Sequence, residues 1–166
     1  MLNREQLTDD QWRAVRNTPH HVALAVSALG GSIFDEMLER SAAMAGIVDA
    51  LNSRHPLLRD IAASTDIMDA QDQVRTWYHG LEDAERNIDS LRTKALLSLQ
   101  DAILALNACG ATDDVRHYGD FVIALATRVA RAAREGDLFG VGGELVSTHE
   151  RSFIELLEVT IDSAGR

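Results

Sequence analysis

The sequence is poor in cysteine, in proline and in long apolar runs, and each shortage excludes a class of protein. The single cysteine, Cys109, excludes an internal disulfide framework and fits a reducing compartment, so we expect a cytoplasmic protein. Only Pro19 and Pro56 interrupt the 166 residues, so long helices can form with few breaks. No run of about eighteen apolar residues occurs, and residues 1–10 lack the apolar stretch of a signal peptide. We therefore expect neither a targeting segment nor insertion into a membrane.

Basic side chains are also scarce relative to acidic ones. Sixteen Lys and Arg residues stand against 26 Asp and Glu residues, which gives a formal net charge of −10. A polyanionic surface would be repelled over a Debye length of about 10 Å, so we expect no nucleic-acid partner. The length is that of one domain with its own core, and we expect residues 1–166 to form a single domain.

Helical periodicity is what the sequence has in abundance. No segment alternates apolar and polar residues for long enough to predict a strand. Capping boxes start two helices, Thr8 with Gln11 and Ser147 with Glu150. Pro19 and Pro56 are expected in the first turns of two others, and Gly110 is expected to end a helix. The expected helices cover about residues 8–16, 18–30, 32–54, 56–61, 65–79, 82–109, 112–135 and 147–161.

The expected helix over residues 82–109 is the longest, and its apolar residues lie on more than one face. A helix with this distribution is usually central in its bundle. The sequence therefore predicts an all-α fold, a single compact bundle of about seven or eight helices with a long central helix.

Motifs of catalysis are absent from the sequence. There is no nucleophile elbow of the G-x-S-x-G kind, and Cys109 ends an apolar helical stripe, as a buried structural thiol does. Asp114 and His117 have helical spacing, but the further pairs that a di-iron bundle needs are missing, so we expect the histidines to be solvated or to cap helices. The glycine-rich segment 140–143 lacks the lysine of a phosphate-binding loop. These observations favour a protein without catalytic activity.

Two glycine loops share a pattern. In each, a helix runs into glycines, and carboxylates follow at the start of the next helix: Asp35 and Glu36 in one, Glu144 and Glu150 in the other. If the two halves of the chain pack about a pseudo-twofold axis, the four carboxylates meet at one end of the bundle and could bind a hard divalent cation through oxygen. Alternatively, each carboxylate only stabilises its helix N-terminus, by about 0.3–1 kcal/mol.

This pattern resembles the tellurite-resistance TerB-like family, whose helical domains have about this length and carry two A-D-G-x-[IV]-x-x-x-E-like motifs. The resemblance implies a non-enzymatic helical protein that acts by binding a protein partner in a stress response. It also implies a divalent cation held by Asp35, Glu36, Glu144 and Glu150. Gly30 and Gly143 stand where the family has its signature aspartates, so the implied cation site is weak or lost.

Two other functions stay open. One is a small-molecule binder or an enzyme with a pocket between helices, rimmed by the polar residues Trp77, Tyr78, His79 and His117. The other is a structural homodimer that buries an alanine-rich stripe, formed by Ala124, Arg128, Ala132 and Glu135.

Overall fold

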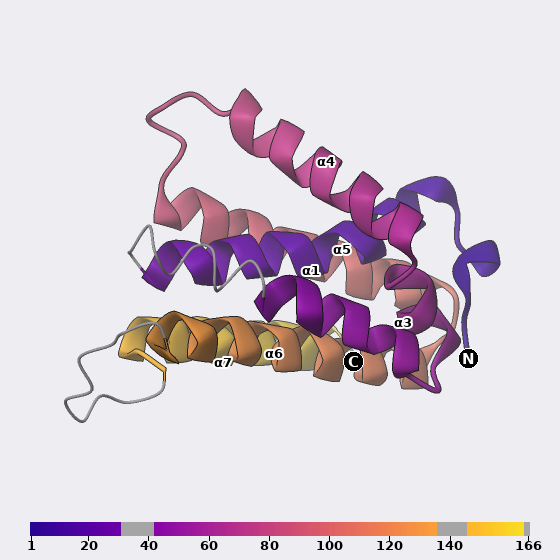
Figure 1. The fold of residues 1–166 in the computed structure, drawn as a ribbon. Coiled ribbons are helices and arrows are strands. Elements are labelled where there is room, and N and C mark those ends of the chain that lie inside the picture. The colour runs from indigo at the N-terminus through magenta and orange to yellow at the C-terminus, as the bar shows by residue number, and fades with distance from the viewer. Residues whose placement is uncertain (31–41, 136–145, 165–166) are drawn as a thin grey trace.

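The computed structural model describes residues 1–30, 42–135 and 146–164, and every regular element in these ranges is a helix (Figure 1). Two are short 3₁₀ helices, η1 (Arg4–Gln6) and η2 (Ala50–Asn52). The α-helices are α1 (Asp9–Gly30), residues 42–49, α3 (Pro56–Ile61), α4 (Ser64–Gly80), α5 (Ile88–Ala108), α6 (Thr112–Glu135) and α7 (Thr148–Ala164). The predicted all-α bundle is confirmed.

The bundle is built around α5, which packs against α1, α6 and α7. In Figure 1, α1 and α5 lie side by side over the α6–α7 pair, and α4 crosses obliquely above them. The central place of α5 agrees with the prediction, but α5 begins at Ile88, six residues later than expected, and its 21 residues make it shorter than α1 (22 residues) and α6 (24 residues). Asn87 sets this start, because its side chain accepts a hydrogen bond from the Ser90 N–H as an N-cap.

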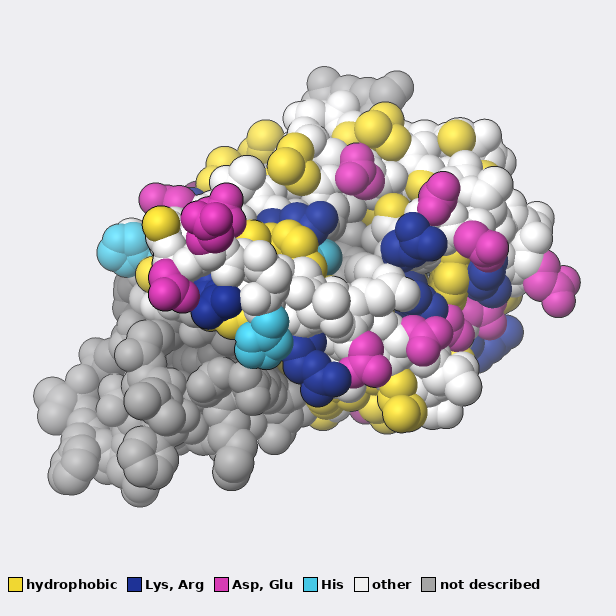
Figure 2. Space-filling view, turned by 90° about the horizontal axis from the view of Figure 1, so that it is seen from above, with side chains coloured by type: hydrophobic (Ala, Val, Ile, Leu, Met, Phe, Trp, Pro, Cys, Tyr) yellow, Lys and Arg dark blue, Asp and Glu magenta, His cyan; other side chains and the backbone are white. Residues whose placement is uncertain are grey.

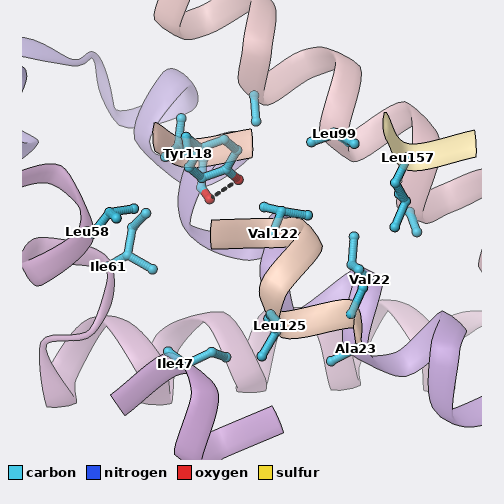
Figure 3. Packing of buried hydrophobic residues seen from close by; sticks show 14 of the residues in the cluster. Val22, Ala23, Ile47, Leu58, Ile61, Leu99, Tyr118, Val122, Leu125 and Leu157 are labelled. Carbon is cyan, nitrogen blue, oxygen red and sulfur yellow. Dashed lines mark hydrogen bonds between the residues drawn. The ribbon is translucent and has the colours of Figure 1, made fainter. Parts of the chain in front are cut away.

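The core lies where α1, α5, α6 and α7 meet. Figure 3 shows Val22, Leu99, Val122 and Leu157, one from each of these helices, converging beside Tyr118. All of them are essentially inaccessible to solvent. Burying an apolar side chain of this size stabilises the fold by about 1.5–3 kcal/mol, so the four-helix contact dominates the packing.

Helix α1 corrects one prediction. Instead of two helices separated at Thr18 and Pro19, the chain forms one helix of 22 residues with Pro19 inside it. Proline has no N–H to donate to the carbonyl four residues before it, here that of Val15. The Tyr118 hydroxyl donates to that carbonyl instead, at 2.8 Å, and the helix continues (Figure 3).

Other local predictions are confirmed. The capping box of Thr8 and Gln11 starts α1, since each side chain accepts a hydrogen bond from the other residue's N–H. Pro56 opens α3 at its first turn. Gly110 follows the end of α5 with a φ of 68°, a left-handed conformation that glycine adopts without steric cost.

Some predictions fall on residues outside the described ranges. They include the glycine-rich segment 140–143 and the first part of the helix expected over residues 32–54. In the part of the chain that the structure describes, no helix is both long enough and apolar enough to cross a membrane.

Candidate binding groove

Of the four carboxylates predicted to bind a cation, Asp35, Glu36 and Glu144 lie outside the described residues. Glu150 lies in the first turn of α7 and is 1% exposed. Its Oε2 accepts a hydrogen bond from the Ser147 N–H at 2.7 Å, and the Glu150 N–H donates to the Ser147 hydroxyl at 3.2 Å. The predicted capping box is therefore confirmed. The other oxygen, Oε1, is buried without a hydrogen-bond partner in the described ranges.

Metal ligands do not gather elsewhere in residues 1–30, 42–135 and 146–164. No three His, Cys, Asp or Glu side chains in these ranges form a group that could hold a metal ion. Of the four predicted cation ligands, the described ranges therefore contain Glu150 alone.

A groove of about 530 Å³ that could receive a ligand lies between α1, α4 and helical residues 42–49. We call it the α1–α4 groove. Its floor is formed by four residues of α1, at helical spacings of 3, 4 and 7: His20, Ala23, Leu24 and Ser27. Ligand pockets in proteins typically measure about 300–1,000 Å³, so the groove has the size of a small-molecule site.

His20 is the unusual residue of this floor. It is 9% exposed, and its Nε2 has no hydrogen-bond partner among the described residues. Burial, together with the nearby positive charge of Arg16, lowers the pKa of His20 to about 4, so the ring is neutral near pH 7. A buried polar group without a hydrogen-bond partner lowers the free energy of unfolding by about 1–3 kcal/mol, so we expect His20 to destabilise the folded protein by this amount.

The walls of the groove come from α4 and from residues 42–49. Helix α4 turns its buried side, Ile67, Ala70 and Val74, towards the bundle, and Val74 also reaches the groove. Its polar groove residues recur at helical spacing and so share one face: Gln71, Asp72, Arg75, Tyr78 and His79. Ala43 and Met44 line the opposite wall.

Two contacts define the chemistry of these walls. The Gln71 side-chain amide donates to the Met44 sulfur at 2.8 Å and so connects the walls. Arg75 forms an ion pair with Asp72, with Nη2 and Oδ1 2.6 Å apart. Among the described residues that line the groove, Asp72 and Arg75 are the two formally charged groups, and they neutralise each other.

His21, the next residue of α1, packs against Trp77 of α4. Its ring meets Trp77 edge to face, with centroids 5.0 Å apart, and Lys94 lies over the same Trp77 ring at 5.6 Å. Burial and the positive charge of Lys94 lower the pKa of His21 to about 3. The expectation that His20 and His21 are solvated or cap a helix is wrong, because both are buried within α1.

The predicted pocket rim is correct in part. Tyr78 and His79 line the α1–α4 groove, whereas Trp77 packs on His21 and His117 packs on His55. Sequence reasoning missed His20. Its spacing from Ala23, Leu24 and Ser27 is that of one helical face, and this was the signal that could have found it.

A second buried polar cluster holds the bundle together rather than forming a site. The Asp114 carboxylate accepts a hydrogen bond from the Leu2 N–H at 2.7 Å, and the same oxygen lies 3.0 Å from His55 Nε2. Burial lowers the pKa of His55, and the negative charge of Asp114 opposes that shift. Asp114 thus connects α6 to the residues before α1 and before α3.

Two smaller grooves of about 370 and 310 Å³ run along the α6–α7 contact. Their charged side chains, such as Asp120, Glu155 and Glu158, are exposed to solvent. Neither groove is lined by a buried side chain whose polar atom lacks a partner in the described ranges, so neither has a feature like His20.

The stripe proposed for a homodimer lies on α6. Ala124 is exposed, and Arg128 forms an ion pair with Asp49 of the same chain, with Nη1 and Oδ2 2.5 Å apart. A homodimer through this stripe stays a prediction.

The face on the α4 side, seen from above, carries acidic and basic side chains interspersed with apolar ones over its described part (Figure 2). No protein-family model matches the chain, and no curated protein or solved structure matches it. The fold and the groove define an all-α protein with one candidate small-molecule site in its described residues. Membership of the TerB-like family stays a prediction.

Proposed function

We propose that this protein is a binding protein without catalytic activity, and that the α1–α4 groove receives a small organic molecule. The observation that carries the proposal is the groove itself, about 530 Å³ in volume, whose lining combines apolar side chains with the buried, neutral imidazole of His20.

The surroundings of His20 support binding rather than catalysis. Two floor residues, Ala23 and Leu24, and one wall, Ala43 and Met44, are apolar, and such surfaces favour ligands that bury apolar area. The charged pair among the described lining residues, Asp72 and Arg75, is exposed, and its two charges neutralise each other. An acid–base pair or an activated nucleophile would need a second reactive group within hydrogen-bond distance of His20, and the described contacts supply none.

The proposal is tested with N-phenyl-1-naphthylamine, an uncharged probe whose fluorescence rises in apolar surroundings. We expect saturable binding of one probe per chain. Ser27→Trp places a large ring in the groove from a half-buried position of α1 and should weaken binding by about tenfold or more, because it occupies the volume that the probe needs.

Arg13→Trp is the matched control, since it places the same ring at an exposed position of the same helix. It should bind the probe like the parent protein, and circular dichroism should show both variants folded. Binding that Ser27→Trp leaves unchanged, or no saturable binding at all, would contradict the proposal.

A divalent-cation site, with partner binding in a stress response, is a second candidate from the TerB-like resemblance. It is favoured by the unpartnered Oε1 of Glu150, a buried carboxylate oxygen of the kind that calcium or magnesium accepts as a ligand. Asp35, Glu36 and Glu144 would supply the remaining oxygens.

Isothermal titration with calcium, magnesium, manganese and zinc tests this candidate. We expect binding heat for at least one cation, and about tenfold weaker binding in Glu150→Gln, because the amide keeps the capping box but removes the charge. Absence of both heat and a thermal shift at millimolar metal would rule the cation out.

A further inference from the structure

We propose that two copies of this chain associate through the outer face of α5, with the two α5 helices antiparallel across a twofold axis. The outer face of α5 is made of the exposed residues between positions 93 and 108: Thr93, Leu97, Gln100, Asp101, Leu104 and Ala108. None of the described residues that line the α1–α4 groove belongs to α5, so this inference is independent of the proposed function.

Two leucines form the centre of this face. Leu97 and Leu104 are 53% and 60% exposed, although α5 is otherwise the central helix of the bundle. They are seven residues apart, which is two helical turns, so they lie in one line along the helix. Association that removes both leucines from water is favourable through the hydrophobic effect.

Helix α7 widens the apolar surface. It runs beside α5 in the same direction, since the Arg92 guanidinium lies 5.5 Å from the centre of the Phe153 ring and the Asn107 side chain donates to the Ala164 carbonyl at 2.6 Å. Two exposed apolar residues of α7 do not line the grooves between α6 and α7, and so lie on its other side: Leu156 and Val159. The apolar surface is therefore two helices wide.

The charge of this face favours a second copy over another partner. The chain carries a net charge of −10, so two copies repel each other over most of their surfaces. Asp101 is the one charged residue among the six of the outer face of α5. Two copies can therefore approach here against little repulsion, whereas a basic partner would gain more from a face with several carboxylates.

The polar residues of the face match a twofold axis. Gln100 and Asp101 lie on opposite sides of the line of leucines, and their side chains form no hydrogen bond within the described part of the chain. An axis that passes between them places Gln100 opposite the partner's Asp101, to which its amide can donate. The same axis places Leu97 opposite the partner's Leu104. Both the apolar and the polar parts of the face are therefore complementary to a second copy of themselves.

Sedimentation velocity over about 5–500 μM protein tests the proposal. We expect a monomer–dimer equilibrium with half-association at roughly 10–100 μM, because a face two helices wide is at the small end of specific interfaces. Leu104→Glu should weaken association by about tenfold or more, since it places a carboxylate in both symmetric apolar contacts. Met68→Glu adds the same charge at an exposed position of α4, and this control should associate like the parent protein.

A mixture of two variants tests the antiparallel arrangement. Leu97→Lys alone should also weaken association by about tenfold. An equimolar mixture of Leu97→Lys and Leu104→Glu chains should associate about tenfold more tightly than either variant alone. In the mixed dimer the introduced ammonium and carboxylate lie opposite each other, and one contact between two leucines remains. Circular dichroism should show both variants folded, because both positions are exposed.

Three results would overturn the proposal. The first is a chain that stays monomeric over the whole concentration range. The second is a dimer that Leu104→Glu leaves intact, which would move the contact to another face, such as the alanine-rich stripe of α6. The third is a mixture that associates no better than its components, which would exclude the antiparallel arrangement. Leu104→Glu should bind N-phenyl-1-naphthylamine like the parent protein, so the outcome for the groove is measured separately.

Discussion

Tyr118→Phe is expected to lower the free energy of unfolding by about 1–3 kcal/mol, although it removes only one oxygen atom. The Tyr118 hydroxyl is buried and donates to the Val15 carbonyl at 2.8 Å. Since Pro19 cannot supply the N–H that this carbonyl would receive in an ordinary helix, the substitution leaves a buried acceptor without a donor. Denaturant unfolding, monitored by circular dichroism, measures the loss.

A double-mutant cycle with Pro19→Ala isolates the cause. Alanine restores the N–H at position 19, so Tyr118→Phe should cost less than half as much in that background. The cycle reports the coupling between the two sites directly. Equal costs in the two backgrounds would show that the Tyr118 hydroxyl contributes the same stability whether or not residue 19 has an N–H, and that the missing proline N–H plays no part.

Acid is expected to destabilise the protein through the buried rings of His20 and His21. Burial lowers the pKa of His20 to about 4 and that of His21 to about 3, against an ordinary value of 6.5 that applies in the unfolded chain. Between these values the unfolded state binds more protons than the folded state. The stability that the neutral rings confer is therefore complete above pH 6.5 and is lost as the pH falls towards the folded-state pKa values.

The size of the effect follows from the two shifts. Between about pH 7 and about pH 4.5, each histidine should remove roughly 2–3 kcal/mol of stability. Denaturant unfolding at the two pH values measures the difference for the parent protein, His20→Phe and His21→Phe. Each substitution should reduce the pH dependence, and His149→Gln, at an exposed position, serves as the control. A pH dependence that both substitutions leave unaltered would mean that neither ring is buried in its neutral form.

Much of the fold could be predicted because its signals are local. Capping boxes at Thr8 and Ser147, Pro56 at a helix start and Gly110 at a helix end all act within a few residues. The break expected at Pro19 is a case in which local sequence signals predict the wrong helix boundary. Whether a helix continues through proline depends on a donor for the freed carbonyl, and here that donor is Tyr118, 103 residues further along the chain.

The candidate site was harder to predict for a similar reason. Tyr78 and His79 could be suggested as rim residues because they are polar and share a helix. The groove itself arises from the way α4 lies beside α1, which no local pattern specifies. The spacing of His20 from Ala23, Leu24 and Ser27 places these residues on one face of α1, but it does not show that this face becomes the floor of a groove.

Helix α4 packs mainly against α1 and buries only Ile67, Ala70 and Val74, whereas α7 packs against three helices, α1, α5 and α6. Segments with few buried apolar contacts open locally at a much lower free energy than global unfolding requires. One wall of the groove can therefore move while the four-helix core stays intact. A molecule bound between α1 and α4 would restrict that opening. Binding would therefore reduce the motion of α4 and leave the core unchanged.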